Sequence, residues 1–275
     1  MIPLFGFGMA LVIGLCLGIM GSGGSILTVP VLVYLFRMDP VPATAYSLFI
    51  VGVTSLIGLS TRLRAGKVDF RATLLFAAPS LIAVFLVRKY VVHALPEAFE
   101  MPWGPPLSRG SLIMGVFGLV MSAAALSMLF HSKAGALCAN GDEPYAWTGR
   151  NASVIGIEGL LVGTITGFVG AGGGFLIVPV MVLSGHLSME TAIGTSLTII
   201  FAQSLVGFLT DLSLLSDIRW PFLLGFTGLS VLGVVAGGFL GRYIRGQSLR
   251  RAFGWFTLVV AISILGHEFF LRSVS

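Results

Sequence analysis

The sequence predicts an all-α membrane protein, and three observations support this prediction. The chain has 275 residues, of which 56% are hydrophobic and only 10% are charged, with a mean hydropathy of +1.01. A soluble domain carries about 25% charged residues, so this chain cannot cover a soluble surface with polar groups. Apolar stretches of bilayer length recur along the chain. They show no strand-like alternation over about ten residues, so the predicted spans are helices rather than barrel strands.

About eight hydrophobic segments are expected, since a helical span needs about 20 apolar residues. They cover residues 4–36, 43–61, 71–92, 110–130, 152–185, 190–210, 219–241 and 250–271. The first and the fifth are longer than a plain span, and each contains a glycine cluster near its middle. Residues 131–151 are polar and lie near the middle of the chain, which favours a linker between two halves.

The two halves repeat each other at an offset of 149 residues. Nine identities fall within positions 14–31: Gly14, Gly18, Gly21, Gly23, Gly24, Leu27, Val29, Pro30 and Val31 match Gly163, Gly167, Gly170, Gly172, Gly173, Leu176, Val178, Pro179 and Val180. The match continues through Ser47 and Ser196 to Ser55 and Ser204. We therefore predict a first transmembrane repeat at 1–130, a polar linker at 131–151 and a second repeat at 152–275, each repeat with four segments.

The glycine clusters at 21–24 and 170–174 are predicted to break a membrane helix or to form a re-entrant hairpin. Irregular backbone at membrane depth is tolerated only where it is buried in protein or lines a cavity. Broken helices at matching positions of two halves indicate a transporter binding site. The segment after each break begins with free N–H groups and a positive dipole end, which suits an anion without Lys or Arg. A nucleotide-binding loop is excluded, because neither copy has the required motif or a βαβ context.

The glycines ahead of each cluster have a simpler interpretation. Gly14 and Gly18, like Gly163 and Gly167, have the small-xxx-small spacing that lets helix backbones approach closely. These four positions therefore predict helix packing as well as, or instead of, a site.

Hydroxyl and amide side chains near the clusters are candidate anion ligands. The predicted substrate-binding set is Gly21, Ser22, Gly23, Gly24, Ser25, Ser47, Gly170, Gly172, Gly173, Gly174, Ser196 and Gln203. The alternative for the serines is capping of the following helix or bonding to their own helix backbone.

Glu158 lies inside the fifth segment, where a carboxylate is costly and therefore indicates function. We predict it as the proton-coupling candidate, the alternative being a position at the membrane interface. Asp211 and Arg62 end their segments and are predicted to mark the membrane boundary.

Several classes of function are not expected. The net charge of +5 is attributed to Lys and Arg flanking the spans rather than to nucleic-acid binding. Cys16 and Cys138 lie in unlike surroundings, which argues against a disulfide framework. The histidines are scattered and do not have the spacing of metal ligands. The sequence offers no nucleophile–base pair that would indicate an enzyme. We expect no metal and no cofactor.

The paired motif GxxxGxxGxGG…VP, followed by A-x3-S-L, resembles the TauE/SafE family of sulfite and organosulfonate exporters. The resemblance covers nearly the whole chain and implies about eight helices in the cell (inner) membrane. It implies transport of sulfite, a sulfonate or a related anion, with the motif on Gly21, Gly23, Gly24 and Pro30 and on Gly170, Gly172, Gly173 and Pro179. Ser25 stands where the family pattern has a last glycine, which makes the two halves of the expected site unequal.

Taken together, these patterns predict a secondary transporter, an exporter by resemblance, of a small sulfur-containing or organic anion, with coupling to protons left open. A passive anion channel with the same glycine-rich filter is the alternative, and a membrane sensor or scaffold is a third. If the first and fifth segments are hairpins, Lys and Arg concentrate on one side, which favours inverted over parallel repeats. The expected partners are a small anion and the lipid bilayer, and a homodimer stays open.

Overall fold

The computed structural model is α-helical and describes residues 2–21, 24–92, 94–96, 98–99, 107–130, 149–170, 172–183, 185, 187–212, 218–240 and 246–267. Its elements begin with α1 (Ile2–Met20), α2 (Ser25–Pro30), the π-helical η1 (Val31–Leu35), α3 (Pro40–Arg64), α4 (Phe70–Leu86) and the π-helical η2 (Val87–Val92). They continue with β1 (Ala98–Phe99), β2 (Leu107–Ser108), α5 (Arg109–Phe130), α7 (Gly149–Val169), α8 (Gly174–Leu183), α9 (Met189–Leu212), α10 (Trp220–Leu240) and α11 (Gly246–Gly266). The two short strands pair antiparallel. Most of the predicted linker, 131–148, lies outside the described residues.

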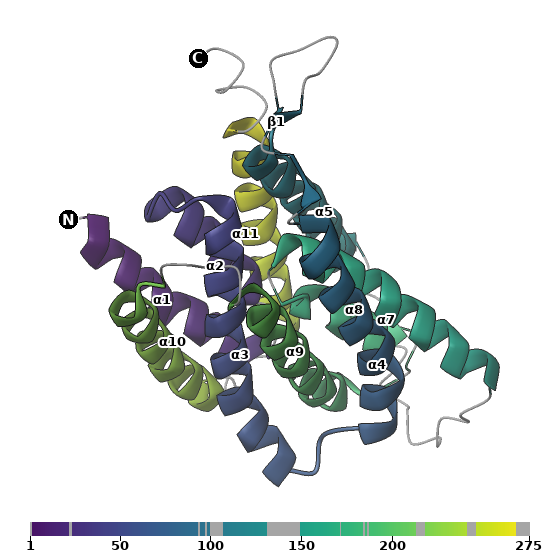
Figure 1. Ribbon diagram of the computed structural model, residues 1–275. Helices are drawn as coiled ribbons and strands as arrows, with labels where there is room; N and C mark the ends of the chain where they lie inside the picture. The colour runs from purple at the N-terminus through teal and green to yellow at the C-terminus, as the bar shows by residue number, and fades with distance from the viewer. Residues whose placement is uncertain are drawn as a thin grey trace.

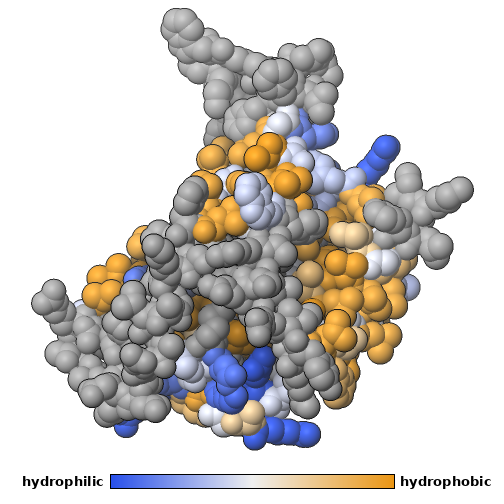
Figure 2. All heavy atoms as spheres, turned by 180° about the vertical axis from the view of Figure 1, so that it is seen from behind, coloured by the Kyte–Doolittle hydropathy of each residue, from blue (hydrophilic) through white to orange (hydrophobic). Residues whose placement is uncertain are grey.

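Five helices of the described chain are long and apolar enough to cross a membrane. They are Pro40–Arg64, Phe70–Val92, Arg109–Leu126, Glu190–Leu212 and Trp220–Leu240. Large hydrophobic side chains on the outer faces of α4 and α10 are exposed, for example Leu74 and Ile82 on α4 and Leu232 and Phe239 on α10. Figure 2 shows hydrophobic side chains over the flank of the molecule, with strongly hydrophilic ones near its lower end and at its upper right. This distribution fits a multi-pass protein in a lipid bilayer.

The helices pack in pairs, and each pair joins a helix from the first half of the chain to one from the second half. α1 lies along α10, α4 along α7, α3 along α9 and α5 along α11. In Figure 1 the α1–α10 pair lies on one side, α4 and α7 lie on the other, and α3 and α9 stand between them. Each half of the chain therefore completes its packing with helices of the other half.

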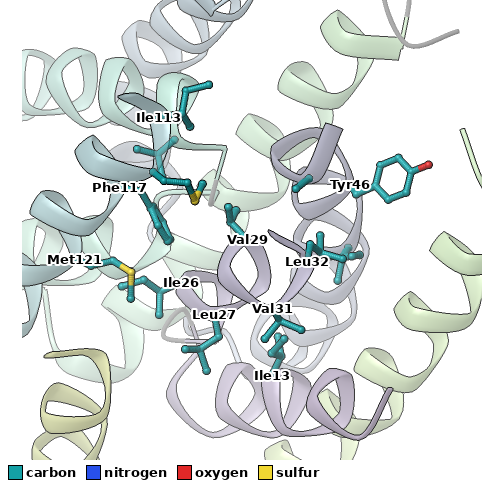
Figure 3. Close-up of a cluster of buried hydrophobic side chains, with 14 of the residues drawn as sticks. Ile13, Ile26, Leu27, Val29, Val31, Leu32, Tyr46, Ile113, Phe117 and Met121 are labelled. Atoms are coloured by element: carbon teal, nitrogen blue, oxygen red, sulfur yellow. The ribbon is translucent and has the colours of Figure 1, made fainter. Parts of the chain in front are cut away.

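The largest core cluster surrounds α2 and η1. Ile26, Val29 and Leu32 are fully buried there, against Ile13 of α1 and against α5. Figure 3 shows Met121 of α5 beside Ile26, and Val31 beside Ile13. This apolar packing holds the short α2 segment in the interior and so fixes the position of the chain that precedes it.

The structure confirms the helix-packing interpretation of Gly14, Gly18, Gly163 and Gly167. A Cβ at Gly14 would meet the Ser230 carbonyl of α10, and one at Gly18 would meet the Val234 carbonyl. Gly163 and Gly167 of α7 make the matching contacts with Ser80 and Val84 of α4. Because the backbones touch at these positions, a side chain there would force the helices apart.

Replacing Gly14 with valine should lower the free energy of unfolding by about 1–3 kcal/mol, because the new side chain would overpack a contact between two helix backbones. Gly8→Val is the matched control: it lies on the same helix and a Cβ there has no neighbour within 4 Å. Thermal unfolding in detergent measures both variants. Equal melting temperatures for the two would contradict the close α1–α10 contact.

Candidate functional site

The break between α7 and α8 is built by glycines in left-handed backbone conformations. Gly170 has φ +71° and its N–H donates to the Thr166 carbonyl at 2.8 Å, which caps the end of α7. Gly172 and Gly173 have φ +70° and +62°, a region that L side chains rarely adopt. The chain then enters α8 at Gly174, and the Gly173 carbonyl accepts from the N–H of Leu176 at 3.0 Å.

The break between α1 and α2 has a similar beginning and a different end. Gly21 has φ +78° and its N–H donates to the Leu17 carbonyl at 2.7 Å, 149 residues before the matching bond at Gly170. Gly24 accepts from Leu27 at 3.2 Å, as Gly173 does from Leu176, but its φ is −67°. Ser22 and Gly23 lie outside the described residues.

The α7–α8 break lies against the packed pair of α3 and α9. The region where these two helices contact each other is termed the α3–α9 crossing. These helices run antiparallel, since Leu48 lies against Gly207, Gly52 against Ser204 and Gly58 against Leu197. A Cβ at Gly172 would lie 2.7 Å from Val51 Cγ1 of α3 and 3.2 Å from Ser204 Oγ of α9. The glycine backbone is therefore in contact with both central helices, which it could not approach with a side chain.

Several polar side chains on these two helices have no hydrogen-bond partner among the described residues. Ser47 and Ser55 of α3 and Gln203 and Ser204 of α9 are fully buried, and their side-chain oxygens and the Gln203 amide nitrogen are unsatisfied. Buried polar groups are normally hydrogen-bonded. A buried polar group without a hydrogen bond costs about 1–3 kcal/mol of stability. Such a cluster beside a helix break is a candidate binding site.

Other predicted ligands behave differently. Ser196 donates to the Ile193 carbonyl of its own helix at 2.9 Å, the structural alternative noted for serines in helices. Ser25 is buried at the start of α2. Thr28 and Thr166, which the sequence did not single out, are buried with unsatisfied hydroxyls. Thr166 also touches the position of a Cβ at Gly173, so it belongs to the break.

A buried ion pair lies beside the same break. Arg88 Nη1 of η2 donates to Asp211 Oδ2 at the end of α9, and the two side chains are 0% and 3% exposed. A Cβ at Gly170 would touch Arg88 Nη2 and Thr44 of α3. Asp211 therefore does not lie at an exposed membrane boundary, because it is buried against Arg88 of η2.

Glu158 is not brought to this site. It is half-buried on α7, twelve residues before Gly170, which is about 18 Å along a helix. Its neighbour Gly159 packs against Phe76 of α4. The carboxylate near the glycine break is Asp211. A role for Glu158 in proton coupling stays a prediction.

Comparisons with known proteins agree with this architecture. Residues 6–264 match the family described as "Sulfite exporter TauE/SafE". The chain belongs to the TauE/SafE family. A relative from Xylella fastidiosa, named a probable membrane transporter protein, is 28% identical over 92% of this chain and 91% of its own length. Another, the probable membrane transporter protein YunE of Bacillus subtilis, is 26% identical over 86% of this chain and 88% of its own.

A third relative, the probable membrane transporter protein MJ0441 of Methanocaldococcus jannaschii, is 22% identical over 74% of this chain and 71% of its own length. No solved structure matches the chain. The family and its transporter relatives make this protein a multi-pass membrane transporter of TauE/SafE type.

Proposed function

We propose that this TauE/SafE protein is a secondary transporter, working as an exporter, of a small sulfur-containing or organic anion such as sulfite or a sulfonate. The site is the junction of the α7–α8 break with the α3–α9 crossing. The observation that carries the proposal is the close approach of Gly172 to Ser204, since a Cβ at Gly172 would lie 3.2 Å from the buried, unsatisfied Ser204 hydroxyl. The α1–α2 break is its companion in the first half.

The chemistry of the junction suits an oxyanion. The first N–H groups of a helix have no intrahelical acceptor, and the helix dipole favours negative charge at that end. α8 begins at Gly174, two residues after Gly172. The hydroxyls of Ser47, Ser55 and Ser204 and the Gln203 amide can donate to anion oxygens without a net positive charge.

The arrangement of the central helices favours inverted repeats and alternating access. α3 and α9 occupy matching places in the two proposed repeats, and they run antiparallel. Inverted repeats that rock against each other around a fixed midplane site are a common basis of secondary transport. A passive anion channel with the same filter remains the alternative function, and ohmic current across a bilayer would favour it over a carrier.

Anion binding to the purified protein tests the proposal. We expect sulfite, a sulfonate or a related anion to raise the melting temperature. The paired substitution Ser204→Ala and Gln203→Leu should weaken that binding at least about tenfold, which is about 1.4 kcal/mol. Ser263→Ala is the matched control, because Ser263 is exposed and donates to the Val259 carbonyl of its own helix. Equal binding by the paired variant would place the anion elsewhere, and no binding by any small anion would contradict the substrate class.

A further inference from the structure

The ion pair of Arg88 and Asp211 connects the glycine break to a titratable group. Arg88 Nη1 is bound to Asp211, while Nη2 of the same guanidinium lies against Gly170. Gly170 is two residues before Gly172, which touches Ser204. The guanidinium therefore extends from the carboxylate of α9 to the backbone of the proposed anion site.

A purely structural role explains this pair poorly. A buried ion pair gives little net stability, because desolvation of both charges offsets their attraction, and apolar residues of similar size often serve as well. A planar guanidinium, in contrast, is the side chain best suited to bind oxyanions through parallel N–H groups. The guanidinium lies beside the left-handed backbone of Gly170, with Thr44 of α3 as the neighbouring side chain.

The net charge of the Arg88–Asp211 pair limits how an anion can bind beside it. Asp211 already neutralises Arg88, so an anion at Gly170 would put a second negative charge beside one buried cation. An uncompensated charge in a dry interior is strongly unfavourable. The guanidinium stays protonated at all accessible pH values, so the carboxylate is the group that can change.

We propose that the transported anion binds Arg88 at Gly170, and that the Asp211 carboxylate takes up one proton for each anion bound. In this step Asp211 becomes a neutral carboxyl group, its hold on Arg88 weakens, and the guanidinium turns to the anion. No net charge is added to the site, since one proton enters with one monoanion. This inference rests on the proposed function and makes Asp211, rather than Glu158, the coupling carboxylate.

Other titratable groups lie on the helices around the pair. In the described chain they are Arg71, Lys89 and Tyr90 on α4 and η2, Glu158 on α7, Glu190 on α9, and Tyr46, Arg62 and Arg64 on α3. Lys89 is exposed, with its Nζ 5.4 Å from the ring centres of Phe85 and Tyr90. Glu190 bonds Lys67, about 31 Å along α9 from Asp211. The Tyr46 hydroxyl accepts from the Arg219 N–H.

Arg71, Arg62 and Arg64 lie at the opposite ends of their helices. Arg71 is seventeen residues before Arg88, and Arg62 and Arg64 are eighteen and twenty residues after Thr44. These spacings correspond to about 26–30 Å along a helix. Asp39 precedes α3, five residues before Thr44, and is exposed. Asp211 is the buried carboxylate paired with Arg88, so we assign the proton uptake to it.

The test measures the binding of methanesulfonate as a function of pH. Methanesulfonate is the probe because this strong-acid anion keeps a single negative charge over the pH range used. For the wild-type protein, we expect affinity to rise up to about tenfold per pH unit as pH falls from about 7.5 to 5.5, because one proton is bound with each anion. Asp211→Asn should bind with pH-independent affinity and, at about pH 7.5, at least about tenfold more tightly than wild type. Glu158→Gln should keep the wild-type pH dependence.

Three results would overturn the inference. They are pH-independent binding by the wild type, a wild-type pH dependence in Asp211→Asn, and loss of the pH dependence in Glu158→Gln alone. If Asp211→Asn does not fold, Arg88→Met combined with Asp211→Leu removes both charges, and that folded variant should lose methanesulfonate binding; retained binding would overturn the inference. Absence of binding to the wild type by methanesulfonate and also by sulfite, sulfate and acetate would instead refute the proposed function itself.

Discussion

Replacing Gly172 with alanine is expected to weaken anion binding at least about tenfold, or about 1.4 kcal/mol, while the protein stays folded. The new Cβ would lie 2.7 Å from Val51 Cγ1 and 3.2 Å from Ser204 Oγ. It would therefore push the break away from the α3–α9 crossing and fill the approach to the Ser204 hydroxyl. Melting temperatures measured with and without sulfite or methanesulfonate report folding and binding together.

Gly66→Ala is the control for backbone strain. Gly66 has φ +67°, close to the +70° of Gly172, but a Cβ there has no neighbour within 4 Å. Both variants bear the cost of a left-handed alanine, about 1–2 kcal/mol. The Gly66 variant should bind anions as the wild type does. Similar binding by both variants would show that the crossing is not the site.

Asp211→Leu is expected to lower the free energy of unfolding by about 3–5 kcal/mol, because it leaves the buried Arg88 guanidinium without its counter-ion. Adding Arg88→Met should restore most of that loss, since the pair of charges is then replaced by apolar side chains of similar size. Denaturant or thermal unfolding in detergent measures both variants. The recovery in the double variant distinguishes loss of charge balance from simple loss of packing.

Lys67→Ala provides the comparison for an exposed ion pair. Lys67 bonds Glu190 with side chains that are 41% and 62% exposed, and exposed pairs contribute about 1 kcal/mol or less. We expect a change in stability well below that of Asp211→Leu. An equally small loss in Asp211→Leu would mean that water reaches Arg88 and that the pair is not buried.

The sequence predicts the helical membrane architecture because its signals are local. Apolar length and low charge predicted spans that include α3, α4, α9 and α10, and small-xxx-small spacing predicted the close contacts of Gly14 and Gly163. Polar residue type, together with matching positions in the two halves, also marked Ser47 and Gln203 as candidate ligands, and both are buried with unsatisfied side chains. The domain boundaries, the repeat and the assignment of these residues to a substrate stay predictions.

The ion pair could not be predicted in the same way. Arg88 and Asp211 are 123 residues apart, so their contact depends on how α4 and α9 pack. Arg88 follows a long apolar run, where a basic residue normally marks a membrane boundary. Arg88 instead lies buried in the π-helical turn η2, which no local sequence pattern marks. Ser204 did have a signal, the match of Ser55 and Ser204 in the repeat alignment.

Counterflow in proteoliposomes tests whether the glycine break is a transport site. Vesicles loaded with unlabelled sulfite and diluted into labelled sulfite should accumulate label transiently above its external concentration, as a carrier with one alternating site requires. We expect this overshoot for the wild type and for Gly66→Ala, and its loss for Gly172→Ala. Label that only equilibrates in the wild type, or an undiminished overshoot in Gly172→Ala, would contradict a transport site at the glycine break.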